Sequence, residues 1–335
     1  GVIAVEPVGD GEEINEMVRF TFERLSDHRI AQRLLNTHVG DGDPEPAFIT
    51  GGALASYVAG RGSSRFAGIA EALAVQLPER YGVELIDVVD GKFSRWELAH
   101  AFQLSLLWRR QDAFTKRTLE LVEECADAIG GDAVLETLLA IATEPDNLFN
   151  ADHLDRWLQP LPMYERDIEW STRATYIAVD GDGDGAIETL IEWVLANGLE
   201  PIELPRARLV AITLAWLTSL SHRWVRDMAT KALATLLVNR RELAAQMIEK
   251  FANVDDAYVV DRVLAAAYGA ATRNSSDDGL AELARVAFAA VFTNDRPPTH
   301  ALVRDHARGI VELAASRGVL PADISLDCAR PPYPG

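Results

Sequence analysis

The sequence predicts an all-α solenoid of stacked antiparallel helical hairpins. Three observations predict it: an internal repeat in the carboxy-terminal half, apolar stripes at helical spacing, and short polar joins between the helices. A hydrophobic content of 48% over 335 residues also provides enough apolar surface for a sizeable core. We expect helical repeats over residues 151–335 and an irregular helical region, continuous with them, over residues 1–150.

The repeat is the clearest of these signals. Three segments align without gaps: VRDMATKALATLL from Val225, VVDRVLAAAYGAA from Val259, and VRDHARGIVELAA from Val303. An aspartate stands two residues after each of these valines, at Asp227, Asp261 and Asp305. Apolar residues follow four, seven and eight positions after the valine, which places one stripe along a helix. The valines should therefore lie in a buried face.

A second apolar helix precedes each repeated segment. These helices are ARLVAITLAWLTSL, ELAAQMIEKF and LAELARVAFAAVF, and joins such as SHR and NVDDA connect them to the repeats. The sequence thus predicts three hairpins. A single hairpin cannot cover its own apolar face, so neighbouring hairpins must stack and share a core.

The first half of the chain is helical but less regular. The segment FTKRTLELVEECADAIG has one apolar stripe and stops at Gly130 and Gly131, as a helix end should. SSRFAGIAEALAVQLPERYG and RWELAHAFQLSLLW follow the same pattern, whereas GVELIDVVDGKF can form a short strand or extend a helix. Loops near residues 40–52 and 143–153 mark breaks.

The net charge of −19 disfavours non-specific binding to nucleic acid, because that binding requires Lys and Arg to displace counterions. Positive and negative residues balance over residues 221–335, so residues 1–220 carry the whole excess. Two readings stay open: a solvated acidic surface, or a surface for a basic partner.

The two cysteines, Cys125 and Cys328, give neither a disulfide framework nor a metal-binding spacing, which fits a reducing cytoplasm. The longest apolar run, residues 209–220, is shorter than the roughly 20 residues that cross a bilayer. The amino terminus lacks the pattern of a signal peptide. We expect a cytoplasmic protein without a membrane span and, from the ends of the chain, a segment of a longer protein.

The stretch VDGDGDGAIETLIEW partly matches an EF-hand calcium loop. Its candidate metal ligands are Asp180, Asp182, Asp184 and Glu188. Position 12 of the loop should be a bidentate Glu, but Ile191 occupies it. The favoured reading is an acidic turn in which Asp184 caps the following helix. A calcium site is the alternative.

The repeated aspartates also have two readings. They can bond to Arg or to loop backbone across successive repeats, or they can form a polar stripe that binds a ligand. Trp170, Trp193, Trp216 and Trp224 are expected to be buried rather than to form a stacking platform. No histidine pair has metal spacing and no nucleophile elbow occurs in the sequence. We expect no catalytic residues and no cofactor in this segment.

Four stretches carry a family resemblance: RWVRDMATKALATLL, VDDAYVVDRVLAAAYGAA, RDHARGIVELA with a trailing PPY, and ALAVQLPERYGVEL. Over residues 65–335 they resemble the HEAT-like or armadillo-like helical region of large bacterial ATP-binding proteins of the STAND type, a class with members in antiviral defence. The resemblance implies a sensor or scaffold arm. It includes no catalytic residue, and no P-loop motif occurs in the chain, so any NTPase domain would lie outside it.

The expected function is therefore non-catalytic. The surface would bind a protein partner, or neighbouring domains of the same polypeptide, and couple that binding to an NTPase domain elsewhere. The alternative is a calcium or small-ligand module centred on residues 180–188, and an enzyme is the third reading.

Overall fold

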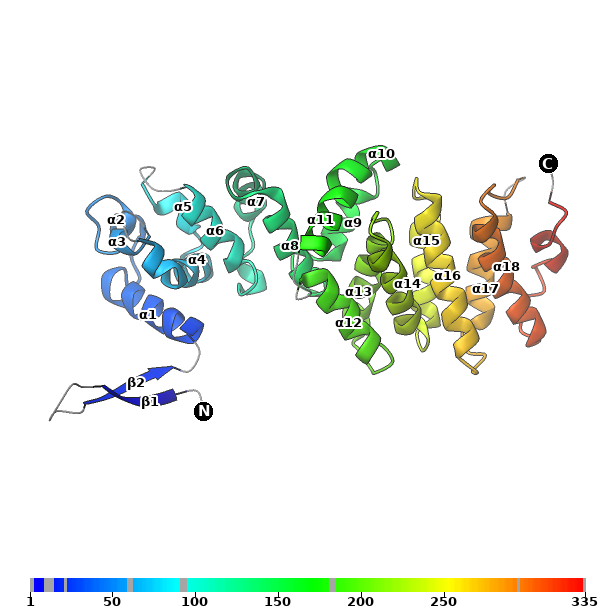
Figure 1. Ribbon diagram of the computed structural model, residues 1–335, viewed down its shortest axis with the longest axis horizontal. Helices are drawn as coiled ribbons and strands as arrows, with labels where there is room; N and C mark the ends of the chain where they lie inside the picture. The colour runs from blue at the N-terminus through cyan, green and yellow to red at the C-terminus, as the bar shows by residue number, and fades with distance from the viewer. Residues whose placement is uncertain are drawn as a thin grey trace. The chain divides into compact units, whose positions relative to one another are not determined.

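The computed structural model describes residues 3–8, 15–20, 23–58, 63–90, 95–180, 185–293 and 296–333. These residues form two compact units, Gly1–Thr137 and Leu138–Gly335. Figure 1 shows that helices build both of them. The division follows Thr137, whereas the boundary predicted from the sequence follows residue 150.

The amino-terminal unit starts with a β-hairpin that the sequence analysis did not predict. Strands β1 (Ile3–Val8) and β2 (Asn15–Phe20) pair antiparallel, with Ile3 opposite Phe20 and Val8 opposite Asn15. The sequence does carry a signal for it, because β-branched residues flank the turn-forming stretch GDG.

Helices make up the rest of this unit. They are α1 (Glu23–His38), α2 (Glu45–Phe48), α3 (Ala55–Val58), η1 (Ser63–Phe66), α4 (Ala67–Tyr81), α5 (Leu85–Val88), α6 (Arg95–Ser105), η2 (Gln111–Ala113) and α7 (Lys116–Ile129). Helix α8 (Gly131–Ile141) crosses the division between the units. Helix α4 packs against both α1 and α6, around a core that includes Leu35, Phe48 and Leu73.

Local sequence explains the boundaries of α7. Thr115 and Thr118 form a capping box at its start, and Gly130 ends it at a φ of 95°, which a residue with a side chain rarely adopts. Residues 85–88 are helical, so the strand reading of GVELIDVVDGKF is wrong for that part of it.

The carboxy-terminal unit consists of stacked helices. They are α9 (Ala151–Leu158), α10 (Met163–Arg166), the π-helical turn η3 (Asp167–Ser171), α11 (Thr172–Asp180), α12 (Ala186–Asn197), α13 (Leu204–Leu217), α14 (Arg223–Leu237), α15 (Arg241–Phe251), α16 (Ala257–Arg273), α17 (Leu280–Phe292), α18 (Ala301–Ser316) and η4 (Leu326–Ala329). The pairs α13–α14, α15–α16 and α17–α18 are the three hairpins that the repeat predicts.

These hairpins stack as an all-α solenoid. Helices α12, α14, α16 and α18 contact one another in sequence, while α15 contacts α17 in a second layer (Figure 1). Val225, Val259 and Val303 are at most 2% exposed, which confirms that the repeated valines share a buried seam. Helices α16 and α18 pack closely at Gly309, where an added Cβ would meet the Tyr268 ring at 2.8 Å.

Arginine side chains donate hydrogen bonds to backbone carbonyls in the loops of neighbouring hairpins. Arg240 Nη1 donates to Gly198 O at 2.7 Å, Arg241 Nη1 donates to Asp278 O at 2.7 Å, and Arg317 Nη1 donates to Ser276 O at 2.9 Å. Loop carbonyls that would otherwise lack partners are thus bonded across the stack. Within the described ranges, no helix combines the length and the apolarity that crossing a bilayer requires.

Candidate functional site

A groove of about 410 Å³ opens in the carboxy-terminal unit. One wall is the helical segment 163–172, the floor is the loop 219–221 between α13 and α14, and the other wall is formed by Arg226, Asp256 and Tyr258. The groove therefore lies where the amino-terminal ends of α14 and α16 meet the start of the unit's helical stack. We call it the α14 groove.

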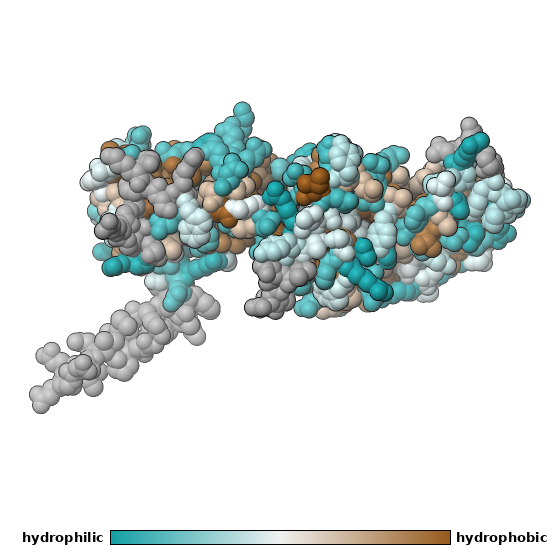
Figure 2. All heavy atoms as spheres, turned by 45° about the horizontal axis from the view of Figure 1, so that its top comes forward, coloured by the Kyte–Doolittle hydropathy of each residue, from teal (hydrophilic) through white to brown (hydrophobic). Residues whose placement is uncertain are grey.

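The helical segment that forms the first wall exposes apolar side chains, of which Met163 lines the groove while Tyr164 and Ile168 lie outside its lining. The π-helical turn η3 lies between α10 and α11, and such turns are frequent at functional sites. Trp170 faces inward and is fully buried, whereas Tyr164 and Ile168 are each 64% exposed and Met163 is 49% exposed. The face shown in Figure 2 is mostly hydrophilic, with brown atoms in a few separate places. Single exposed apolar residues are ordinary on a surface, but three of them on one segment are less so.

A buried arginine holds this wall against the start of α16. Arg166, 1% exposed, donates from Nε to Leu158 O at 3.2 Å and lies 3.8 Å from Asp256 Oδ2. Burial lowers the pKa of Arg166 and raises the pKa of Asp256. Asp256 also caps α16 by accepting from Tyr258 N and Val259 N. The carboxylate of Asp256 is therefore committed to structure.

Arg226 is the polar group of the groove with unused bonding capacity. Its Cζ lies 5.3 Å from the centroid of the Tyr258 ring, a cation–π contact. Its buried Nε has no hydrogen-bond partner, and Arg226 forms no ion pair with any residue that the structure describes. The hydroxyls nearby are engaged, since Ser171 donates to Ser219 O and Ser219 donates to Trp216 O. A buried polar atom without a partner is uncommon and calls for an explanation, and a ligand in the groove is one.

A second hollow, of about 500 Å³, follows the exposed side of α14 and is lined by His222, Arg223, Trp224, Asp227, Met228 and Lys231. His222 occupies the N-cap of α14 without a side-chain cap bond, and its buried Nδ1 has no hydrogen-bond partner. Trp224 is 41% exposed and the side chain of Arg223 is 87% exposed. The α14 groove and this hollow share one helix.

The repeated aspartates lie near the amino-terminal ends of α14, α16 and α18. Asp227 lies 3.7 Å from Arg262 Nη1 of the next hairpin, and Asp261 Oδ1 lies 2.9 Å from His306 Nδ1 of the hairpin after that. Asp305 pairs within its own helix, with Arg308 at 3.0 Å. Two of the three aspartates thus join successive hairpins.

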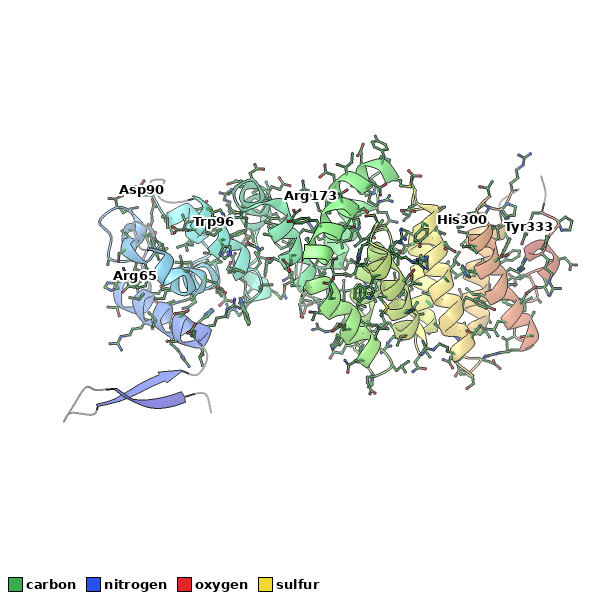
Figure 3. The ribbon with its side chains drawn as sticks, in the orientation of Figure 1. Arg65, Asp90, Trp96, Arg173, His300 and Tyr333 are labelled. Carbon is green, nitrogen blue, oxygen red and sulfur yellow. The ribbon has the colours of Figure 1, made fainter. Side chains whose placement is uncertain are left out.

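The arginines that accompany the aspartates also contact aromatic rings. Arg304, at the repeat position of Arg226, lies 5.2 Å from the ring centroid of Tyr333, which Figure 3 labels near the carboxy terminus. The repeat pattern gives no signal for Tyr258 and Tyr333 as partners of these arginines, because both tyrosines lie outside the aligned segments.

Most of the candidate calcium loop lies outside the described residues. Asp182 and Asp184 lie outside the described residues, as does the side chain of Asp180, and Glu188 is buried in the first turn of α12. The N-cap position of α12 is Gly185, and Asp184, for which the sequence predicts a capping role, lies outside the described residues. Among the residues that are described, no group of three or more His, Cys, Asp or Glu side chains is arranged to hold a metal. Calcium binding stays a prediction.

The tryptophans divide into two classes. Trp170 and Trp216 are fully buried as predicted, and Trp170 Nε1 donates to Ser219 Oγ at 3.0 Å. Trp193 and Trp224 are 38% and 41% exposed, so the expectation of burial is wrong for them. Each lies near the edge of its helix's apolar stripe, where helical spacing alone does not decide burial.

The amino-terminal unit has a separate pocket of about 240 Å³ between α3, α4 and α6. Trp96, labelled in Figure 3, lies on α6 and stacks on His100 with ring centroids 5.2 Å apart. Val58 and Leu104 line the pocket with them. Glu71, also in its lining, pairs with Arg24 at 3.4 Å. The sequence analysis did not identify this pocket.

No family model, no curated protein and no solved structure matches this chain. The geometry of the described residues therefore carries the functional argument.

Proposed function

We propose that this chain is a non-catalytic solenoid segment that binds a protein partner in the α14 groove. The observation that carries the proposal is Arg226, whose buried Nε has no partner, in a groove that Met163 also lines. The same helical segment exposes Tyr164 and Ile168 outside the lining of the groove. Arginine and aromatic side chains are enriched among the residues that dominate binding energy at protein interfaces.

The surroundings of Arg226 support binding rather than reaction. Asp256 is occupied by the cap of α16 and by Arg166, and Ser171 and Ser219 donate to backbone carbonyls. Rigid helices position the exposed side chains, so a partner loses little free energy in ordering them. An apolar wall beside a polar floor suits a peptide segment with both kinds of side chain.

The stacked hairpins provide a route for coupling. A partner in the α14 groove would touch the segment 163–172, α14 and α16 together. Such a partner favours the inter-hairpin angle at which all three contacts form, and so selects one curvature of the solenoid. In line with the resemblance to STAND-type proteins, we propose that this curvature is passed to an NTPase domain outside the chain.

The test uses site-specific photo-crosslinking in cells that express the gene of this protein. A benzophenone amino acid replaces Ile168 in one protein and Leu204 in the other, because Leu204 is similarly apolar and 56% exposed but lies at the start of α13. We expect a protein adduct at residue 168 and none at residue 204. The same adducts at both positions would contradict the proposal.

The captured protein is then purified and titrated calorimetrically. We expect Ile168→Glu to abolish its binding and Leu204→Glu to preserve it. Unchanged binding to the Ile168→Glu protein would remove the α14 groove as the interface.

A further inference from the structure

We infer that the partner segment is acidic, and that one of its carboxylates binds Arg226. This inference rests on the proposed function, because it concerns the same groove. It adds the chemistry of the partner: carboxylates toward α14 and apolar side chains toward the segment 163–172.

Helix α14 carries more basic than acidic side chains. The chain carries a net charge of −19, yet α14 contains Arg223, Arg226 and Lys231 against the single acid Asp227. Asp227 is shared with Arg262 of the next hairpin, so it compensates the α14 cations only in part. Helix α14 is therefore net positive on an acidic protein, and its cations favour an anionic ligand.

The guanidinium of Arg226 has hydrogen-bond donors that no residue of the described structure uses. Arg226 has a planar guanidinium held over the Tyr258 ring, and its Nε lacks a partner. A carboxylate can accept from the two Nη groups at once, a bidentate geometry that makes arginine–carboxylate pairs strong. The Nδ1 of His222, at the uncapped start of α14, also lacks a partner, and the positive end of a helix dipole adds to the attraction.

The other charges of the groove set the orientation of the segment. Asp167 lies on the opposite wall, and Asp256 is paired with Arg166. A run of carboxylates across the whole groove would meet Asp167, so the acidic residues belong over α14. Met163 in the groove, with Tyr164 and Ile168 exposed on the same segment outside its lining, favours apolar residues toward the segment 163–172. Trp224 and Met228 offer a further apolar contact beside the cations.

The experiment titrates the full chain with two fluorescein-labelled decapeptides of alternating Leu and Glu or alternating Leu and Lys, followed by fluorescence anisotropy. We expect the Glu peptide to bind and to weaken as NaCl rises from 50 to 300 mM. Arg226→Gln should weaken it at least about tenfold, the loss of one charge-assisted hydrogen bond pair. Arg226→Lys keeps the positive charge but not the bidentate guanidinium, so its affinity for the Glu peptide should lie between those of the wild type and Arg226→Gln.

The matched control is Arg285→Gln. Arg285 is an exposed arginine on α17 that pairs with Glu282 and Asp323, so its loss changes the net charge equally, away from α14. We expect it to bind the Glu peptide as the wild type does. Thermal unfolding by circular dichroism verifies that every variant is folded.

Two outcomes would overturn the inference: equal weakening in Arg226→Gln and Arg285→Gln, or a Lys peptide whose binding depends on Arg226. The captured partner separates this inference from the proposed function. If the partner binds Arg226→Gln normally but fails to bind Ile168→Glu, the acidic segment is wrong and the α14 groove is still the interface. If it binds both variants normally, both proposals fail.

Discussion

His306 Nδ1 lies 2.9 Å from Asp261 Oδ1, and this contact joins α18 to α16 between successive hairpins. The side chain of Asp261 is 4% exposed, while those of Asp227 and Asp305 are 38% and 50% exposed. Residues at the same place in the repeat therefore differ in what they contribute to stability.

Asp261→Ala should destabilise the protein more than the equivalent substitutions. It leaves His306 without its partner in a partly buried position, at a cost of about 1–3 kcal/mol. Asp305→Ala removes an exposed pair within one helix and should stay within about 0.5 kcal/mol. Urea unfolding followed by circular dichroism measures both. Equal midpoints for the two variants would show that the contact between hairpins is not stabilising.

Gly309→Ala should destabilise the stack, because the new Cβ would meet Tyr268 Cε2 and Cζ at 2.8 Å and push the ring away. We expect a cost of about 1–3 kcal/mol, typical of overpacking. Gly269→Ala is the control: it lies in the neighbouring helix α16, and its Cβ would meet only Ala234, at 3.9 Å. That substitution should stabilise the protein by about 0.4–1 kcal/mol. The opposite order of melting temperatures would refute this account of the packing.

Arg166→Met should be severely destabilising. The side chain fills a buried site, and its loss leaves Asp256 without its cationic neighbour and frees the carbonyl of Leu158. Breaking a buried pair at one side costs about 3–5 kcal/mol. Arg156→Met, at an exposed position of α9, should change the free energy of unfolding by less than about 0.5 kcal/mol. Denaturant titration compares the two variants. Similar unfolding midpoints would mean that Arg166 does not hold the segment 163–172 against the start of α16.

Asp152 should make stability depend on pH. Arg208 Nη1 donates to Asp152 Oδ1 at 2.8 Å, and this bond, more than any other influence, holds the pKa of Asp152 below its ordinary value. The lowered pKa means that the ion pair stabilises the fold above the unfolded-state pKa of about 3.9, and that this stability is lost as pH falls through the folded-state pKa. Asp152→Asn should thus melt below the wild type at pH 7.

The two proteins should converge in melting temperature as the pH falls through the folded-state pKa of Asp152, because the wild-type carboxyl is then protonated as well. Melting curves across this range provide the test. A constant difference between them would assign the effect of Asp152→Asn to packing instead of charge.

The sequence was sufficient to predict the hairpins of residues 204–316. Apolar residues recur at helical spacing after Val225, Val259 and Val303, and a helix with such a stripe must bury it whatever its neighbours are. The same reasoning was less successful for Trp193 and Trp224, since it gives the direction of a stripe but not how far the neighbouring helices cover its edges.

The α14 groove could not be predicted from the sequence. Its parts come from residues 163–172, 219–226 and 256–258, and no spacing links them. Neither the exposed side of Ile168 nor the missing partner of Arg226 has a local signature, because both depend on which atoms other helices bring close.

The sequence by itself determined that this chain forms helices, that they pair in hairpins, and that the repeated valines are buried, because helical periodicity and the hydrophobic effect act along each segment. Only the tertiary structure decided which aspartate is buried, with Asp261 against His306 and Asp305 at the surface. The reason is that a carboxylate's burial and partners depend on the residue that the next hairpin places opposite it, and Asp305 lies in the last of the three hairpins.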